Sequence, residues 1–469
     1  MRQTVFDDHK WFSIDDWTMG AYNAWDCRVT ALVFPRLLQE LQDNQQWTFY
    51  QSDYWPLVQA VLTMQQRGLL VDRNEKTRYR KALRKELRET DAEIQAFSNR
   101  EDFNVNASKQ RGELLFDTLG LRPEKITRTG QRSTDQDALI RVLRKLRKKD
   151  EHARPVLEAL FHRSRLHTID TRYLDFDVSE DGRVRPTVKA YGTETLRLAY
   201  AEPPLQQYPK EARNIIHTED GRCFVAADYS QLEARILAVL AGDRASLRVF
   251  ETGEDIHLQN ASDLFGHNRE QWDEMDPTAA TACRDFAKSF LYGTMYGGEA
   301  ETMKNKLYCP CDKCKDKVAP TLGLGPKKKR EAEDRWLGRH PAVTKWRKGL
   351  ARQVFEDKFH VNPFGYKRYF LQPVGDGLKR EAYNFPIQSS AACIVNRAMV
   401  KLHSMRYPAP IVLQMHDSLM LEVPEHEVDH WATTLKHTME TPVPELSNAV
   451  FPVELSVGKS WGSLETYSV

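Results

Sequence analysis

Residues 223–235 read Cys223-Phe-Val-Ala-Ala-Asp228-Tyr-Ser-Gln-Leu-Glu-Ala-Arg235. The five residues before Asp228 are apolar or small, which favours a buried strand, and the pattern from Gln231 to Leu240 favours a helix. The carboxyl end of a buried strand is a common place for a metal or a ligand. An Asp at a strand-to-helix junction also caps the first turn of a helix. Both interpretations of Asp228 stay open from this stretch alone.

A second carboxylate, Asp417, stands in a similar setting near the end of the chain. Apolar runs flank His416-Asp417-Ser418 within residues 410–423, which predicts two strands joined by a turn. Turns favour Asp by themselves. Two carboxylates delivered by strands can also converge and hold two Mg²⁺ ions about 3.5–4 Å apart, an arrangement used in phosphoryl transfer. The sequence therefore offers Asp228 and Asp417 as candidates for a two-metal site.

The third feature is a stripe of two cations and two aromatic side chains. Its members are spaced by four residues, namely Arg284, Lys288, Tyr292 and Tyr296. Side chains with this spacing share one face of a helix. Because Arg and Lys are rarely buried unpaired, the stripe is a poor core stripe and suits a nucleoside triphosphate, with the cations on the phosphates. A solvated amphipathic helix is the alternative.

Length and composition narrow the class of protein. The 469 residues suggest about three domains, and 41% hydrophobic with 29% charged residues is ordinary for a packed globular protein. The formal net charge of +2 means that any nucleic-acid surface must be local. No apolar run approaches the ~20 residues of a membrane span, no signal segment leads the chain, and seven cysteines do not make a disulfide framework. We expect a soluble, reduced, cytoplasmic protein without a membrane partner.

Charged helices are expected early in the chain. A long helix is predicted over 73–97 and a second over about 135–149, where basic residues crowd one end. A solvated face is the simpler interpretation of that basic run, and a clamp over a nucleic-acid backbone is the alternative. The first 48 residues also predict a helix. Its apolar stripe consists of Val29, Leu32, Val33, Leu37, Leu38 and Leu41.

Together these motifs resemble family A, the bacterial DNA polymerase I-like DNA polymerases. Residues 228–235 are similar to the first palm motif of that family, Arg284 to Gly297 to its fingers helix, and His416-Asp417 to its second palm carboxylate. Further matches are Thr195-Leu-Arg197-Leu198, Leu205-Gln206, Asp255-Ile-His257, Arg380-x3-Asn384-x3-Gln388 and Gly458-Lys-Ser-Trp461. The resemblance covers nearly the whole chain. It implies an α+β, right-hand polymerase with an antiparallel-sheet palm, helical fingers and a helical thumb.

The resemblance also divides the chain. The implied parts are 1–48, a C-terminal remnant of a 3′–5′ exonuclease-like domain; 49–165, the thumb; 166–245, the first part of the palm; 246–397, the fingers, with a Cys-rich inserted loop at 308–330; and 398–469, the second part of the palm. Tyr22-x3-Asp26 resembles the last exonuclease motif, but the other carboxylates of that domain are missing upstream. We therefore expect no proofreading by this chain alone. A truncation, a split gene product and an incomplete reading frame all stay open, as does a separate exonuclease or processivity subunit.

The implied activity is template-directed DNA synthesis in replication or repair, with dNMP added to a primer 3′-hydroxyl and pyrophosphate released. Primer–template DNA and dNTPs are the implied partners, and two Mg²⁺ ions, for which Mn²⁺ can substitute, are the implied cofactors. The implied catalytic and metal-binding residues are Asp228, Asp417, Lys288 and, through its backbone carbonyl, Tyr229. The implied dNTP-binding residues are Arg284, Lys288, Tyr292, His257, Glu233 and Gln231. The implied DNA-binding residues are Arg197, Tyr296, Gly297, Arg380, Asn384, Gln388 and His416.

Some of these implied roles are specific. Lys288 would protonate the leaving pyrophosphate, and Glu233, packed with Tyr292, would exclude a ribose 2′-hydroxyl. The sequence departs from the family pattern at Ser418, where Glu is usual, and at Tyr292, where many relatives carry Phe. Tyr at that position implies ready use of dideoxynucleotides. The two variants favour a phage-like setting, in a bacterial or phage-infected host cell.

The segment Cys309-Pro-Cys311-Asp-Lys-Cys314 is not explained by the family. Three thiolates at this spacing can hold one tetrahedral Zn²⁺ together with a fourth ligand, whereas unpaired exposed thiols are the alternative. The candidates for the fourth ligand are Asp312, Asp316 and the distant His340.

Two other functions compete with DNA synthesis. A single-subunit RNA polymerase shares both palm Asp residues and the Lys/Tyr helix, but Glu233 favours DNA. A non-catalytic nucleic-acid binder is the rival from another class, and it has no need of metal-binding carboxylates.

Overall fold

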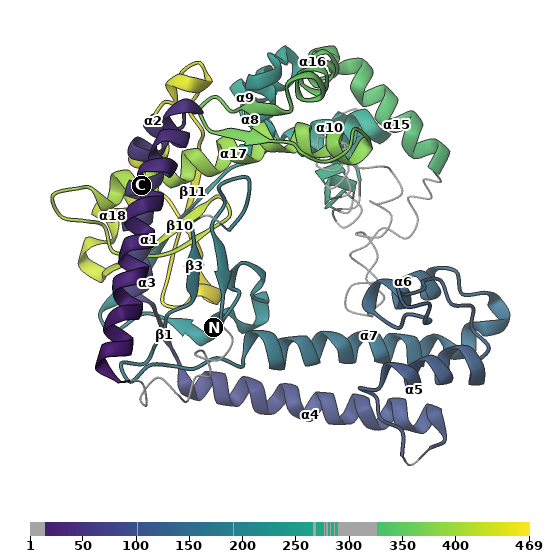
Figure 1. Cartoon of the computed structure of the whole chain (residues 1–469). Coiled ribbons are helices and arrows are strands. Elements are labelled where there is room, and N and C mark those ends of the chain that lie inside the picture. Colours follow the sequence, from purple (N-terminus) through teal and green to yellow (C-terminus); the bar gives the residue numbers. More distant parts are fainter. Residues whose placement is uncertain are drawn as a thin grey trace.

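The computed structural model describes residues 15–469 with the exception of 101, 191, 266–268, 276, 278–279, 282, 286 and 289–325. A five-stranded sheet stands at one side of the molecule, and two groups of helices extend from it on the same side, facing each other (Figure 1). Within the described ranges, no helix is long and apolar enough to span a membrane. The mixture of helices with antiparallel sheets confirms the predicted α+β class.

The five-stranded sheet is antiparallel throughout and has the order β12-β11-β6-β10-β9. The central strand β6 carries the apolar residues quoted first above. It pairs with β10 on one side and with β11 on the other. The strands are β6 (Arg222–Tyr229), β9 (Ile411–Met415), β10 (Ser418–Pro424), β11 (Val453–Gly458) and β12 (Glu465–Tyr467). The strands predicted before Asp228 and within residues 410–423 are thus confirmed.

The two faces of β6 have different environments, because successive side chains on a strand point to opposite sides. Val225, Ala227 and Tyr229 are buried, and the Tyr229 hydroxyl donates to the Met439 carbonyl oxygen at 2.6 Å. Met439 ends helix α18 (Val428–Met439), so α18 covers this face. Asp228 lies between Ala227 and Tyr229 and therefore points to the opposite face.

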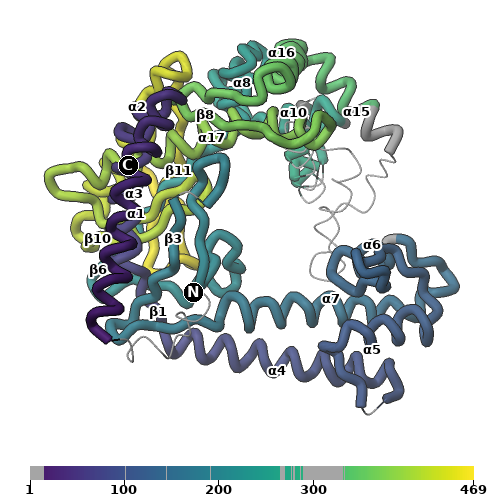
Figure 2. The backbone as a smooth tube through the Cα atoms, viewed as in Figure 1, coloured from purple at the N-terminus to yellow at the C-terminus, as the bar shows by residue number. Residues whose placement is uncertain are grey.

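One group of helices forms a long arm (Figure 2). Helices α4 (Arg73–Ser98) and α7 (Arg154–Thr168) lie side by side along it, and α5 (Ser108–Gly112) and α6 (Gln136–Arg144) lie at its far end. The arm has its own apolar core, which includes Ile94, Leu115 and Leu157. The helix predicted over 73–97 is confirmed. The one predicted over 135–149 was too long, because α6 ends at Arg144 and residues 148–153 form a 3₁₀ helix.

The opposite group of helices contains α8 (Leu232–Ala241), α9 (Arg244–Glu251), α10 (Ile256–Phe265), α11 (Arg269–Asp273), α15 (Pro326–Arg339), α16 (Pro341–Asp357) and the long α17 (Asp376–His403). Pro326 to Arg330 were expected to belong to an inserted loop, but they form the first turn and a half of α15. The rest of that expected loop lies outside the described residues.

Helix α1 (Asp16–Asp43) confirms the helix predicted at the start of the chain, but its apolar stripe is not packed. Val29 is 51% exposed and Leu32 is 62% exposed, and α1 contains no buried residue. The apolar spacing predicted the helix correctly and did not predict a covered face.

Shorter elements connect these parts. They are α2 (Trp47–Phe49), α3 (Trp55–Arg67), β1 (Leu69–Val71), β2 (Arg183–Val184), β3 (Thr187–Lys189), β4 (Ala199–Ala201), β5 (Ile216–His217), β7 (Phe359–Val361) and β8 (Lys367–Tyr369). Strands β2, β1 and β5 form a small antiparallel sheet from which α4 begins. This small sheet is therefore the root of the arm.

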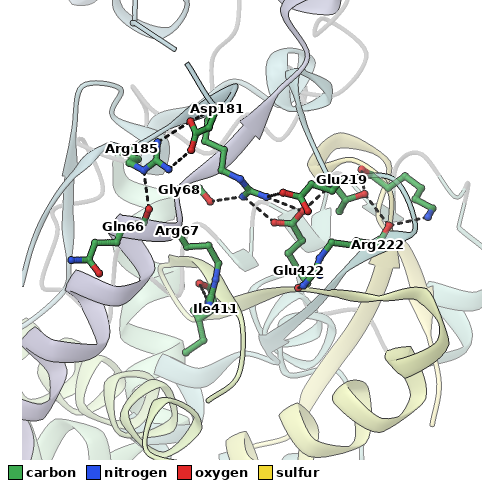
Figure 3. Close-up of polar contacts among 12 residues, drawn as sticks. Gln66, Arg67, Gly68, Asp181, Arg185, Glu219, Arg222, Ile411 and Glu422 are labelled. Carbon is green, nitrogen blue, oxygen red and sulfur yellow. Dashed lines mark hydrogen bonds and ion pairs between the residues drawn. The ribbon is translucent and has the colours of Figure 1, made fainter. Parts of the chain in front are cut away.

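A buried ionic network joins this root to the main sheet (Figure 3). Arg183 of β2 donates to the Gly68 carbonyl oxygen at 3.2 Å and to Glu422 of β10 at 3.1 Å. The same guanidinium pairs with Glu219 at 2.6 Å, and Glu422 also accepts from the Glu219 amide at 3.0 Å. Since Glu422 is only 2% exposed, its charge depends on these partners.

We expect Glu422→Gln to destabilise the chain by about 1.5–3 kcal/mol, the usual worth of hydrogen bonds to charged groups, because Arg183 loses its buried counter-charge. Chemical denaturation of the variant measures this. Glu425→Gln, which removes an exposed carboxylate just beyond the end of the same strand, is the matched control. Equal midpoints for the two variants would contradict the assigned role of the network.

Candidate active site

The two candidate carboxylates meet at one end of the main sheet. Asp228 lies opposite Ser418 in the β6–β10 pairing, and the Tyr229 amide donates to the Asp417 carbonyl oxygen at 3.1 Å. Asp417 occupies a two-residue turn between β9 and β10, in which His416 has the left-handed φ of 54°. The turn predicted for Asp417 is confirmed, and it places this residue one step along the ladder from Asp228. Asp228 does not cap α8, whose N-cap is Gln231.

The two carboxylates disfavour each other's charge. The pKa of Asp228 is raised to about 7, first by lost hydration and then by the negative charges of Asp417 and Glu454, with Lys288 acting in the opposite direction. Burial likewise raises the pKa of Asp417, although a backbone hydrogen bond and nearby cations, Lys288 among them, oppose the increase. The site thus concentrates negative charge that the surrounding cations do not fully neutralise.

This donor set fits a divalent cation. Carboxylate and carbonyl oxygens are the ligands that Mg²⁺ and Mn²⁺ prefer. Asp228 and Asp417 provide carboxylates from adjacent strand ends, and the Tyr229 backbone lies between them in the ladder. A cation bound there would favour the charged form of both carboxylates, and so oppose the burial that raises both pKa values and the repulsion that further raises that of Asp228.

A small cavity of about 220 Å³ adjoins the carboxylates. Its lining residues come from five separate parts of the chain: Arg197, Glu233, Lys288, Ala391, Ala392, His416 and Asp417. Five of these residues were candidate site residues from the sequence, and they come from four distant segments of the chain. The structure brings them together in one place.

Glu233 lies in the first turn of α8 and forms an ion pair with Arg197. Burial raises the pKa of Glu233, and Arg197 opposes that increase. The sequence offered these residues separate partners, a nucleotide for Glu233 and DNA for Arg197, and did not predict their contact. Gln231 precedes this turn with a φ of 56°, and its side-chain oxygen has no hydrogen-bond partner among the described residues.

Arg284 and His257 lie next to each other around Asp255. Arg284 Nε donates to Asp255 Oδ2 at 2.6 Å, and the other Asp255 oxygen accepts from the His257 amide at 2.8 Å. His257 is 1% exposed, and burial lowers its pKa to about 4, with the positive charges of Lys288 and Arg284 acting in the same direction. His257 is therefore a neutral hydrogen-bonding group at pH 7. Lys288, one helical turn beyond Arg284, has an exposed side chain at the cavity.

Three further candidates form a stripe on α17. Arg380, Asn384 and Gln388 are four residues apart and half-buried, and the stripe continues to Ala391 and Ala392 at the cavity. The Asn384 side-chain oxygen has no hydrogen-bond partner within the described ranges. The stripe leads from the site along one helix face, as a surface that follows a bound strand requires.

Several candidates lie outside the described residues: Tyr292, Tyr296, Gly297, Cys309, Cys311 and Cys314. In the part of the chain that is described, no three His, Cys, Asp or Glu side chains form a metal-binding group. His340, the distant candidate for a fourth zinc ligand, is buried and pairs with Asp243 at 2.7 Å.

Sequence reasoning assigned no role to Asp255, Ala391 or Ala392. Asp255 holds Arg284, and the two alanines line the cavity because their small side chains leave space there. Asp255 was visible in the sequence as part of Asp255-Ile-His257. It lies at the start of α10, where its carbonyl oxygen accepts the first helical hydrogen bond, from the Gln259 amide. No spacing in the sequence marked the two alanines.

Comparisons with known proteins agree with this geometry. A family model described as DNA polymerase family A matches residues 73–463. The chain is 30% identical over 454 residues to the thermostable DNA polymerase I of Thermus filiformis, covering 92% of this chain and 50% of the relative. It is 29% identical over 447 residues to DNA polymerase I of Geobacillus stearothermophilus, covering 91% of this chain and 47% of that relative. The chain thus spans about half the length of the curated relatives it matches.

A solved structure is similar over nearly the whole chain. It is the POL domain of Pol1 from M. smegmatis in complex with a DNA primer-template and dNTP, with a TM-score of 0.76 and 26% identity, covering 91% of this chain and 73% of that one. The right-hand polymerase fold is therefore confirmed. The relatives named are bacterial, and the phage-like setting stays a prediction. With motifs, sheet topology and family model in agreement over residues 73–463, this chain belongs to DNA polymerase family A.

Proposed function

We propose that the chain catalyses template-directed DNA synthesis, in which a primer 3′-hydroxyl attacks the α-phosphorus of a dNTP and pyrophosphate leaves. The observation that carries the proposal is the meeting of Asp228 and Asp417 at one sheet end, with Lys288 across a shared cavity. The complex of the similar POL domain with primer-template and dNTP supports the choice of substrates. Family membership supports DNA over RNA as the product.

In this mechanism Asp228, Asp417 and the Tyr229 carbonyl hold the metal ions. Two bound Mg²⁺ ions supply Lewis-acid chemistry, easing ionisation of the attacking hydroxyl and neutralising charge on the phosphate oxygens. Lys288 and Arg284 bind the triphosphate, and Lys288 delivers a proton to the leaving pyrophosphate. Neutral His257 donates a hydrogen bond to the same phosphates. Catalysis then comes mainly from positioning and from charge stabilisation at the transferred phosphorus.

The DNA would lie between the two groups of helices. Under this proposal the arm formed by α4 and α7 is the thumb, the main sheet is the palm, and α8 to α17 include the fingers. Arg380, Asn384 and Gln388 on α17, together with His416 beside the catalytic turn, would follow the primer terminus. Contacts of this kind position the duplex without reading its sequence. Zn²⁺ binding by Cys309, Cys311 and Cys314 stays part of the proposal and is tested by elemental analysis of the purified chain.

Glu233 gives a prediction about sugar selection. Its carboxylate is held at the cavity by Arg197, where it would occupy the space of a ribose 2′-hydroxyl. We expect Glu233→Ala to reduce discrimination against ribonucleotides about 10- to 200-fold, the range that a steric pocket provides. The measurement is the ratio of kcat/KM for a dNTP to kcat/KM for the matching NTP.

The control for this prediction is Glu251→Ala, which removes an exposed carboxylate of the neighbouring helix α9. The control variant should keep the discrimination of the parent. An unchanged ratio in Glu233→Ala, with a folded and active enzyme, would contradict the role given to Glu233.

The function itself is tested by extension of a 5′-labelled primer on a DNA template with Mg²⁺, run in parallel with dNTPs and with NTPs. Full-length products with dNTPs alone are the expected result. Extension with NTPs alone would favour an RNA polymerase. DNA binding without any extension would favour a non-catalytic binder, and either outcome would overturn the proposal.

A further inference from the structure

The residue directly after Asp417 is not acidic in this chain. That position is Ser418, and its hydroxyl donates to the Met415 carbonyl oxygen at 2.8 Å. This hydrogen bond closes the hairpin turn that carries Asp417, so the Ser418 hydroxyl is committed to the backbone. A hydroxyl used in this way adds no negative charge to the site.

Asp228 has a second neighbour on the other side of its strand. In the β6–β10 pairing Asp228 lies opposite Ser418, and in the β6–β11 pairing it lies opposite Glu454. Residues directly opposite each other in antiparallel strands point to the same face, with their Cβ atoms roughly 4.5–5.5 Å apart. Asp228, Ser418 and Glu454 therefore form one row across three strands, on the face opposite the one that α18 covers.

The pattern of burial along β11 agrees with this placement. Glu454 is exposed, whereas Val453 and Leu455 on either side of it are buried. Among the described residues Glu454 makes no hydrogen bond or ion pair. By contrast, the nearby Glu440 accepts from the Val453 amide at 2.9 Å and pairs with Lys436 at 3.5 Å. The carboxylate of Glu454 is thus the one that remains available beside Asp228.

We infer that Glu454 adds a negative charge beside the metal site without binding the ion itself, and that β11 thus provides an acid in a row where β10 carries Ser418. The inference rests on the proposed function. A Glu side chain is one methylene longer than Asp, so from the opposite position on the ladder it reaches toward a cation held by Asp228. Glu454 acts as a positioning residue: its negative charge strengthens cation binding at Asp228 and does not take part in bond making.

The test measures metal affinity apart from turnover. The protein is bound to a primer–template that ends in a dideoxynucleotide, with the next dNTP present, and Mn²⁺ binding is followed by electron paramagnetic resonance. Glu454→Gln is expected to weaken Mn²⁺ binding about tenfold or more, the usual effect of removing an outer partner of a metal ligand. In steady-state extension the Mg²⁺ midpoint should rise by a similar factor, while kcat at saturating Mg²⁺ stays near that of the parent.

A matched control is Glu465→Gln, which removes an exposed carboxylate from β12, one strand further out in the same sheet. This variant should bind Mn²⁺ like the parent. Adding Ser418→Glu to the Glu454→Gln variant should restore affinity, because it returns a carboxylate to the row from the opposite side. Circular dichroism of each variant verifies that it is folded.

Parent-like Mn²⁺ affinity in Glu454→Gln would overturn the inference, as would a loss equal to that in Glu465→Gln. Asp228→Asn, measured in parallel, separates this failure from failure of the proposed function. If Asp228→Asn loses Mn²⁺ and Glu454→Gln does not, the metal site stands without Glu454. If neither variant loses Mn²⁺, the proposed metal site itself is wrong.

Discussion

Asp228→Asn is expected to lower the rate of primer extension at least about a thousandfold, comparable to the loss of a major electrostatic group in an active site. The substitution keeps the size of the side chain and removes the charge that is proposed to hold the metal ions. Asp228 lies at the centre of the row across three strands, with Ser418 on one side and Glu454 on the other. Rapid-quench kinetics on a primed template measures the loss.

The same variant should bind primer–template DNA about as well as the parent, and it should be at least as stable without metal. Lost hydration and nearby acids raise the pKa of Asp228 to about 7. At pH 8, above this pKa, Asp228 is charged in the folded and the unfolded chain, and holding the charge costs the folded state stability. A neutral amide removes that cost. Thermal melting in EDTA and fluorescence anisotropy with labelled DNA provide these two controls. A folded Asp228→Asn variant that keeps a tenth of the parental rate would contradict the role of Asp228.

Lys288→Ala is expected to lower kcat about 100- to 1,000-fold, because its ammonium would otherwise neutralise charge on the triphosphate during transfer. Lys288 has an exposed side chain that lines the cavity with Asp417, Glu233 and His416. Its positive charge also acts on Asp228 and Asp417 and lowers their pKa values. Single-turnover incorporation of one dNTP measures the change.

Lys288→Arg separates the two roles proposed for this residue. Arg keeps the positive charge but does not release a proton at any pH in the working range. If Lys288 is the acid, Lys288→Arg should retain dNTP binding and lose the proton-dependent limb of the pH–rate profile. Lys348→Ala, an exposed lysine of α16 away from the cavity, is the control. Wild-type turnover in Lys288→Ala would exclude both roles.

The strongly patterned segments were predictable from sequence. The apolar run before Asp228 forms β6, the charged run after Val71 forms α4, and the apolar runs around Asp417 form a hairpin. Each of these depends on local periodicity and on turn residues, which sequence carries directly. The convergence of Asp228 and Asp417 was also predicted, because strands that end in carboxylates can deliver both to one edge.

Other features depend on contacts between distant parts of the chain. The pairing of Arg197 with Glu233, and of Arg284 with Asp255, is set by how α8 and α10 pack, so the spacing of these residues did not reveal it. The end of α6 at Arg144 was missed because the basic run after it has good helix propensity, whereas Arg147 pairs with Asp150 in a 3₁₀ turn. The row of Asp228 and Glu454 appears only once the strand order is known.

The central claim is that this chain copies a template, and single-nucleotide incorporation tests it most directly. Four primer–templates that differ only at the first templating base are each offered the four dNTPs separately, with Mg²⁺. The account predicts one-nucleotide extension that follows the Watson–Crick partner of each templating base. Extension that ignores the template, or no extension by folded protein bound to DNA, would contradict it.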